Sequence, residues 1–416
     1  MSTLGKAGPS PPRRRGRRRR AIGMETGSRK RPSSSPALPP DLMREVLSRC
    51  DHETLVRCAV SSRLLCRCML DDPAFLRSRA SGFAPSLFLG LFHHRRDAGT
   101  RFVEAPTLEV IRRAAIGSFL SDNADLLRRF DELVACRGGL VVLRRDTLTS
   151  HNTVELCVCH PMTGRCCILP PPAPGVTGRT VAILTGEDAG SSSPFQLLVV
   201  DVACGWWRGS WMTHLRTQLF SSPRPFPAIM PGGAWGPIRR AAPPQTGLLS
   251  TPGDTPVVIN RVAHWLHTSL EPYEHNVVAL HVDEGRTELI RGPRDLTQTW
   301  KVLLASTADR RLSVVAVEEL VISVSVLSEE ESQSWERHTV IVREGILAYP
   351  TIWLDCFGEK SGMVVICEHY VPWRLVLNLE TKEVTHMPAE ELPWRCYVFE
   401  MDVPSLAAAL LKLPSP

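Results

Sequence analysis

The sequence lacks the long apolar runs and the cysteine density that mark several large classes of protein. Its longest apolar stretches, residues 87–92 and 406–411, are far shorter than the ~20 residues that a membrane-spanning helix needs, so we expect no membrane partner. Its 13 cysteines are an odd number and are too sparse in 416 residues for a disulfide scaffold. No signal peptide is recognisable, and we therefore expect reduced thiols in a protein of the nucleus or the cytoplasm.

Catalytic and metal-binding signatures are missing as well. The chain contains no phosphate loop, nucleophile elbow, zincin helix or calcium loop, so we expect no catalytic residue and no cofactor. The densest group of potential metal ligands is Cys157, Cys159, His160, Cys166 and Cys167. Alternation along a strand would let Cys157 and Cys159 converge, whereas the neighbours Cys166 and Cys167 would face opposite sides. Because paired Cys-x-x-Cys knuckles are also absent, we interpret the group as buried thiols and expect no metal.

Acidic residues are scarce in residues 1–36, where eleven lysines and arginines accompany one glutamate. The whole chain has a formal charge of +6, so a tail of +10 leaves −4 for the rest, and nucleic acid is not a favoured partner of that body. Pro, Gly, Ser and Arg predominate in the tail, which we expect to be disordered. Two basic clusters suit a nuclear-import signal, with a transit peptide and a solvated charge run as the alternatives. The cluster residues are Arg13, Arg14, Arg15, Arg17, Arg18, Arg19, Arg20, Arg29, Lys30 and Arg31.

A first short helix is predicted to begin after Leu38. Pro39 and Pro40 suit a first helical turn, and Asp41 is favourable beside the positive end of the helix dipole. The apolar residues that follow recur at four-residue spacings and form a wide stripe, so one side of the helix should face a partner. These residues are Leu42, Met43, Val46 and Leu47.

Two further short helices are predicted before residue 76. Asp51 or His52 can cap the second helix, and Ser61 or Ser62 can cap the third. The apolar faces are predicted to be Leu55, Cys58 and Ala59 in the second helix and Leu64, Leu65, Cys68 and Met69 in the third. Three helices in fewer than forty residues bury too little apolar surface to be comfortably stable alone, which favours a bound partner. Periodicity alone allows an equal alternative, a helical cap on the following domain.

The spacing of the three helices resembles that of an F-box. The residues that carry the resemblance are Leu38-Pro39, Asp41-Leu42, Glu45-Val46-Leu47, Leu55-Val56-Arg57, Val60 and Asp72-Pro73-x-Phe75. Many members have a Trp after a Val-Cys-Lys-type segment, and this chain departs from them with Val60-Ser61-Ser62-Arg63-Leu64. The resemblance implies binding to a Skp-type adaptor, and through it to a cullin, by Leu38, Pro39, Leu42, Val46, Leu47, Leu55 and Val60.

From about residue 82 the pattern changes to a helical patch at 108–133 and then to short runs of Val, Ile, Leu and Trp, which predict strands. The predicted strands are Leu140–Leu143, Val154–Cys159, Gln196–Val202, Val257–Ile259, Val277–Val282, Leu312–Val317, Val321–Leu327, Met363–Cys367 and Leu375–Leu379. Some are apolar on both faces, which suggests stacked sheets. The expected fold class is α+β, a three-helix F-box (37–80) followed by a mainly antiparallel, β-propeller-like domain (81–413).

A weak internal repeat supports the propeller-like arrangement. Three hairpins, beginning at Val154, Val277 and Leu375, share a strand, a tight turn and a second strand that ends near a proline. Their spacing fits every second or third blade of a propeller with units of ~40 to 50 residues, although three ordinary hairpins are an alternative. The segment 157–170 resembles the Asn-Pro-x-Thr-Gly hairpin in the associated domains of plant F-box proteins, with His160 in place of Asn. Residues 135–143 and 397–402 are similar to stretches in the grass members of that group.

These features together predict the substrate-recognition subunit of an SCF-type (Skp, cullin, F-box) ubiquitin ligase, whose β domain holds an unidentified target protein. Trp206 and Trp207 are the candidate target-binding residues, because two neighbours in a strand point to opposite sides. His93-His94-Arg95-Arg96 is interpreted as a solvated loop. The alternatives are a nuclear nucleic-acid-binding or non-degradative interaction protein that uses the Arg-rich tail, and a hydrolase with dispersed catalytic residues.

Overall fold

The computed structural model separates into two units, Met1–Pro39 and Pro40–Pro416. The residues that it describes are 38–50, 52–70, 82–95, 97–106, 110–146, 154–185, 188, 195–207, 210–222, 233–241, 248–249, 255–270, 273–293, 296, 302–318, 321–329, 334–342, 352–368, 373–388 and 395–402. The basic tail and the import signal expected in it lie outside this set.

Three helices form where the sequence predicted them: α1 (Pro40–Ser48), α2 (His52–Ser61) and α3 (Arg63–Leu70). Ser62 caps α3, because its Oγ accepts a hydrogen bond from the backbone N–H of Leu65 at 3.4 Å. The three helices share a small core of their own, to which each contributes. Its buried residues are Met43, Leu47, Leu55, Cys66, Cys68 and Met69, with Cys50, Cys58 and Leu65 packed against them.

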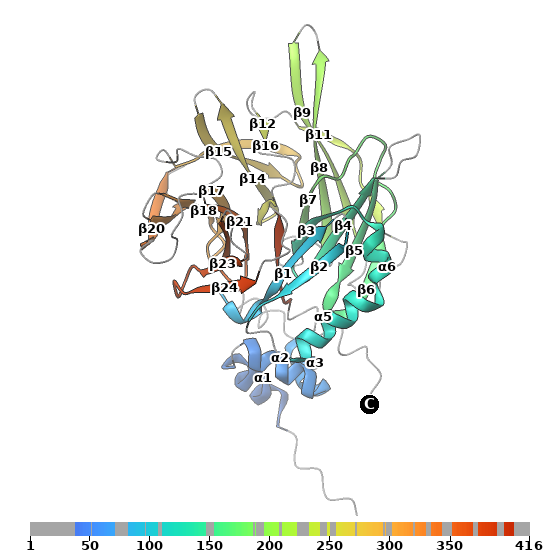
Figure 1. The fold of residues 1–416 in the computed structure, drawn as a ribbon, viewed down its shortest axis with the longest axis vertical. Coiled ribbons are helices and arrows are strands. Elements are labelled where there is room, and N and C mark those ends of the chain that lie inside the picture. Colours follow the sequence, from blue (N-terminus) through green and yellow to red (C-terminus); the bar gives the residue numbers. More distant parts are fainter. Residues whose placement is uncertain are drawn as a thin grey trace, which may run out of the picture. The chain divides into compact units, whose positions relative to one another are not determined.

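The strands form six antiparallel sheets within the described residues, labelled in Figure 1 and called blades 1 to 6 here. Blade 1 contains β1 (Phe88–Arg95), β2 (Gly99–Glu104) and β25 (Cys396–Glu400). Blade 2 contains β3 (Glu132–Arg137), β4 (Leu140–Asp146), β5 (Val154–His160) and β6 (Arg165–Ile168). Blade 3 contains β7 (Thr180–Thr185), β8 (Phe195–Trp207), β9 (Ser210–Ser221), β10 (Ala234–Trp235) and β11 (Arg239–Ala241).

The other three blades follow in chain order. Blade 4 contains β12 (Leu248–Leu249), β13 (Val257–Ile259), β14 (Val262–Leu270), β15 (Tyr273–His281) and β16 (Arg286–Arg291). Blade 5 contains β17 (Val302–Ser306), β18 (Leu312–Val317), β19 (Val321–Leu327) and β20 (Trp335–Val342). Blade 6 contains β21 (Ile352–Phe357), β22 (Met363–Glu368), β23 (Trp373–Asn378) and β24 (Val384–Pro388).

The blades form a closed ring. One strand of each blade contacts a strand of the next, in the cyclic order β25, β3, β7, β13, β17, β21 and back to β25. β25, the last strand among the described residues, closes the ring, because it pairs with β1 at the start of the domain. The sequence therefore builds a β-propeller-like domain, as predicted, and the structure gives it six blades.

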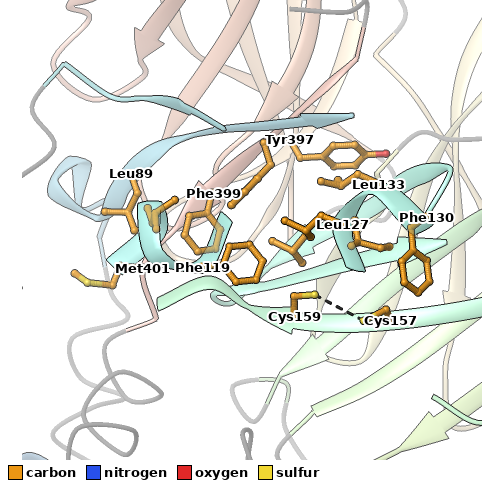
Figure 2. Packing of buried hydrophobic residues seen from close by; sticks show 14 of the residues in the cluster. Leu89, Phe119, Leu127, Phe130, Leu133, Cys157, Cys159, Tyr397, Phe399 and Met401 are labelled. Carbon is orange, nitrogen blue, oxygen red and sulfur yellow. Dashed lines mark hydrogen bonds between the residues drawn. The ribbon is translucent and has the colours of Figure 1, made fainter. Parts of the chain in front are cut away.

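Side chains of β25 alternate between two interblade cores. Tyr397 and Phe399 pack towards blade 2 and the helices α5 (Val110–Asp122) and α6 (Ala124–Arg129), as Figure 2 shows. Cys396 and Val398 pack towards blade 6. The Phe399 ring lies 5.0 Å from that of Phe92 in β1, edge to face. No described helix is both long and apolar enough to cross a membrane.

The predicted helical patch at 108–133 corresponds to α5 and α6, although its last two residues, Glu132 and Leu133, already belong to β3. All nine predicted strands coincide with observed ones, and Val257–Ile259, Leu312–Val317 and Val321–Leu327 match their bounds. The solvated loop expected at residues 93–96 is wrong for its first three residues. They belong to β1, and His93 is only 2% exposed.

The three repeated hairpins are β5–β6, β15–β16 and β23–β24, which lie in blades 2, 4 and 6. Each turn places one residue in the left-handed region, with φ of 69° at Gly164, 68° at Gly285 and 62° at Lys382. The repeat thus occurs in every second blade, one of the two spacings that the sequence allowed.

Candidate functional site

Apolar side chains are unusually exposed on the outer face of α1. Leu42 and Val46 lie one helical turn apart and are 48% and 57% exposed, whereas Met43 and Leu47 point into the helical core. Leu64 of α3 is 46% exposed. Leu38, which precedes α1, is 57% exposed. Four of the seven large exposed apolar residues in the described part of the chain therefore fall in 38–70, which is typical of a surface that binds another protein.

Some of the predicted adaptor residues lie on the surface of the helices, and others lie in the helical core. Leu38, Pro39, Leu42 and Val46 are exposed. Leu47 and Leu55 are each 2% exposed and pack inside the helical core, so they support the exposed face from below, and their contact with the adaptor stays a prediction. Val60 lies in α2, and its side chain is outside the described residues.

Leu64 is exposed, although the helical spacing predicts it on the apolar face of the third helix. Its neighbours Cys68 and Met69 on that predicted face are buried, as expected. Leu64 therefore joins Leu42 and Val46 as a candidate contact residue.

Arg137, the last residue of β3, contacts β7, β13 and the segments that follow β7 and β21. Its guanidinium donates to the carboxylate of Asp188 at 2.8 Å and to that of Glu359 at 2.8 Å. It also donates to the carbonyl oxygens of Ile183 at 2.7 Å and Val258 at 3.1 Å. One side chain of blade 2 thus reaches blades 3, 4 and 6.

Neighbouring charges complete this group, which we call the Arg137 network. Arg310, in the turn after β17, donates to Asp188 at 3.0 Å and so adds blade 5. Burial by itself raises the pKa of Asp188, but Arg137 and Arg310 outweigh that effect and hold the pKa below its usual range. Because the charged groups named here are paired with one another, the network is suited to holding the blades together rather than to acid–base chemistry.

The closing strand is anchored beside this network. The carboxylate of Glu400 accepts hydrogen bonds from the backbone N–H of Ser361 at 2.7 Å and from its hydroxyl at 2.6 Å. Lys360 donates to Asp402 at 3.1 Å. These contacts attach the end of β25 to the turn between β21 and β22.

The hairpin formed by β8 and β9 extends past the other strands of blade 3 (Figure 1). Within the described residues, the third strand beside β8 reaches only Val200, while the hairpin continues to Trp207 and Ser210. Trp206 pairs with Trp211 across the hairpin, and the side chains of both candidate residues, Trp206 and Trp207, lie outside the described set. Their role in target binding stays a prediction.

Two groups of cysteines come together in space. Cys157 and Cys159 converge as predicted, with 3.8 Å between their sulfurs, and Cys166 joins them (Figure 2 shows the first two). A second group, Asp355, Cys356 and Cys396, was not singled out in the sequence, because its members lie on strands far apart in the chain.

Helices with F-box spacing, an exposed apolar face and a six-bladed ring define an F-box protein with a propeller-like domain. Residues 36–76 match the F-box domain. Residues 101–413 match the family described as Domain of unknown function (DUF7595), and the chain belongs to that family. No curated protein matches the chain.

Two solved structures align with the chain. The β-propeller domain of Cps50 (Swd1) from Myceliophteria thermophila is 10% identical over 60% of this chain and 83% of that one, with a TM-score of 0.30. A candidate 6-phosphogluconolactonase from Bacteroides uniformis is 10% identical over 75% of this chain and 92% of that one, with a TM-score of 0.31. Scores of this size carry no argument, so the blade assignment depends on the strand pairing described above.

Proposed function

We propose that this chain is the substrate-recognition subunit of an SCF-type ubiquitin ligase. The F-box would bind a Skp-type adaptor, and the propeller-like domain would hold a target protein near the ubiquitin-loaded enzyme. F-box proteins are typically non-catalytic adaptors, and holding two reactants together raises their effective concentration without bond chemistry in this chain.

The observation that carries the proposal is the exposed apolar face of α1 within a segment that matches the F-box domain. Full burial of a Leu or Val side chain is worth ~1.5–3 kcal/mol, so covering the exposed half of Leu42 or Val46 would contribute about 1 kcal/mol each. Replacing both by Asp removes this contribution and forces two carboxylates into an apolar contact. The adaptor affinity should therefore fall by about 100-fold or more.

The test measures binding of a purified plant Skp-type adaptor to the full chain and to the double variant Leu42→Asp/Val46→Asp. A matched control, Ile168→Asp/Ile238→Asp, changes two apolar residues of the β domain that are 41% and 40% exposed. We expect the control to bind like the unchanged chain, and a chain that starts at Gly82 not to bind. Full binding by the α1 variant would refute the F-box assignment.

We infer that the target contacts the extended β8–β9 hairpin. Among the described residues, no third strand pairs with β8 beyond Val200 or with β9 before Leu215, so a partner strand could pair with the backbone there. The hairpin also carries Trp206, Trp207 and Trp211, a residue type enriched where proteins bind one another.

We further propose that the basic tail directs the chain to the nucleus. Its arginine clusters at 13–20 and 29–31 suit an acidic receptor groove, and deletion of residues 1–36 should shift a fluorescent fusion to the cytoplasm. The same deletion separates this role from nucleic-acid binding, which would appear as a steep salt dependence that the deletion removes. Unchanged nuclear accumulation after deletion would refute the import signal.

A further inference from the structure

A carboxylate and three thiols meet where blade 6 packs against the strand that closes the ring. Asp355 and Cys356 belong to β21, Cys367 to β22 and Cys396 to β25. The ligand atoms of Asp355, Cys356 and Cys396 all lie within 4.8 Å of one another. The group therefore joins the last complete blade to the first one through the chain's final strand.

A β-bulge explains why two neighbours in β21 face the same side. The register with β22 shifts between Leu354 and Cys356, which leaves Asp355 as the extra residue. Leu354 packs into the core between blades 5 and 6, whereas Cys356 packs with Cys396 into the core between blades 6 and 1. Without the bulge, Asp355 and Cys356 would point to opposite faces of the sheet. The bulge thus turns both ligand atoms towards β25.

The distances suit a tetrahedral ion. A zinc ion with Zn–S of ~2.3 Å and Zn–O of ~2.0 Å would separate two sulfurs by about 3.8 Å and a sulfur from an oxygen by about 3.5 Å. The Cys356 and Cys396 sulfurs are 3.8 Å apart, and the Cys367 sulfur lies 3.5 Å from Asp355 Oδ2. The Cys396 sulfur lies 2.8 Å from the same oxygen, a contact that an ion between them would lengthen.

The hydrogen bonds that the Asp355 carboxylate accepts among the described residues come from thiols, and the positive charge of Arg374 lies nearby. Cys396 and Cys367 donate to Asp355, but S–H groups are weak donors, and a largely buried carboxylate is costly without strong partners. A cation would satisfy the carboxylate and the thiolates together.

We propose that Asp355, Cys356 and Cys396 bind a thiophilic divalent cation of the Zn²⁺ type. Cys367 lies beside them and donates a hydrogen bond to the Asp355 carboxylate. The ion has a structural role, because it links β21 of blade 6 to β25 and so fastens the ring at its closure.

The other cysteine group supplies the matched control. Cys157, Cys159 and Cys166 lie on one hairpin, β5–β6, and they offer no carboxylate oxygen. Cys157 and Cys159 pack among apolar residues such as Phe119 and Leu127 (Figure 2), just as Cys356 and Cys396 pack in their own apolar core, so the two groups differ in the carboxylate that only the second one has. The variant Cys166→Ser therefore tests the same chemistry at a site that we do not assign to a metal.

The experiment uses the full chain, stripped of metal under reducing conditions and titrated with Co²⁺ and then with Zn²⁺. We expect one equivalent of Co²⁺ to produce thiolate-to-cobalt charge-transfer bands, which one equivalent of Zn²⁺ abolishes. The Zn²⁺ affinity should fall at least tenfold in Asp355→Asn and should be lost in Cys396→Ser, while Cys166→Ser matches the unchanged chain. Zn²⁺ should also raise the Tm of the unchanged chain and of Cys166→Ser, but not of Cys396→Ser.

Two results would overturn the proposal. The first is the absence of charge-transfer bands in the unchanged chain, which needs no variant and so does not depend on how well a variant folds. The second is unchanged Zn²⁺ binding by Cys396→Ser, because the metal would then lie at another site. This conclusion holds whether or not Cys166→Ser still binds Zn²⁺. Neither result bears on adaptor binding, which is measured separately.

Discussion

Removing the Arg137 side chain tests whether a single residue holds several blades in place. Arg137 is 12% exposed and Asp188 is fully buried, so Arg137→Ala leaves a buried carboxylate without its main partner. Breaking a buried ion pair in this way typically costs 3–5 kcal/mol. Arg310 still contacts Asp188 at 3.0 Å, which places the expected loss of unfolding free energy near ~3 kcal/mol. For a β domain of this size, that corresponds to a decrease in Tm of about 5 °C.

The assay is urea denaturation of the β domain in the single and double variants of Arg137 and Asp188. Because the two residues contact each other, Arg137→Ala/Asp188→Ala should cost less than the sum of the single changes, by about 1.5–3 kcal/mol. A surface pair provides the control. Arg129 and Glu155 are 2.7 Å apart but are 43% and 23% exposed, so Arg129→Ala should cost less than ~1 kcal/mol.

A coupling energy below about 0.5 kcal/mol would refute this reasoning, since it would mean that Arg137 and Asp188 contribute independently. Lowering the pH should also destabilise the domain, because it weakens the ion pair between Arg137 and Asp188. The pKa of Asp188 is lowered in the folded chain, so its contribution is present above the unfolded pKa near 3.9 and is lost as the pH falls through the folded value.

Three further predictions concern the pH response, the ring closure and the target. Burial lowers the pKa of His264 to about 4 from an unfolded value near 6.5, so the unfolded chain binds the extra proton between these values. The free energy of unfolding should therefore be about 2 kcal/mol lower at pH 5 than at a pH above 6.5. His264→Gln should remove most of this decrease when the free energy of unfolding is measured as a function of pH. Phe399→Ala should cost ~3–5 kcal/mol in urea denaturation, because its ring is fully buried in β25; a cost below ~1 kcal/mol would contradict a closed ring. Replacing residues 204–213 by Asn-Gly should abolish ubiquitination of the chain's targets, measured by quantitative proteomics, without changing adaptor binding; an unaltered target set would exclude the hairpin.

Strands that are wholly or almost wholly apolar could be predicted from the sequence. Leu312–Val317 and Val257–Ile259 are buried on both faces and end at polar turn residues, so pattern and structure agree. His93 could not be predicted in this way, because it is a polar residue that is buried by the strand on either side of β1. The pattern of residues along one strand shows which of them are apolar. The burial of a polar residue such as His93 depends on neighbouring strands that come from other parts of the chain.

Contacts between residues that lie far apart in the chain could not be predicted from the sequence either. Arg137 lies in a segment that looks like an ordinary strand followed by a Gly-Gly turn, yet its partner Glu359 comes from blade 6, 222 residues later. The group around Asp355 depends on a β-bulge, which shifts the register by one residue without any distinctive composition. On α1, the periodicity identified the apolar residues but not which of two adjacent stripes was outward, since Leu42 and Met43 differ only in their position around the helix.

The helices α1 to α3 and the β domain have separate cores. The two roles proposed for them, adaptor binding and target binding, can therefore be tested separately. The helical core draws its buried residues from α1, α2 and α3, whereas the closure of the ring depends on β25 and its contacts with blades 1, 2 and 6. A change such as Leu47→Ala should therefore weaken adaptor binding indirectly, by ~2–5 kcal/mol of lost helical stability, and leave the unfolding of the β domain unchanged. Phe399→Ala should have the opposite profile. If either variant altered both properties equally, adaptor binding and target binding would be energetically coupled, and the chain would act as a switch rather than as a simple bridge.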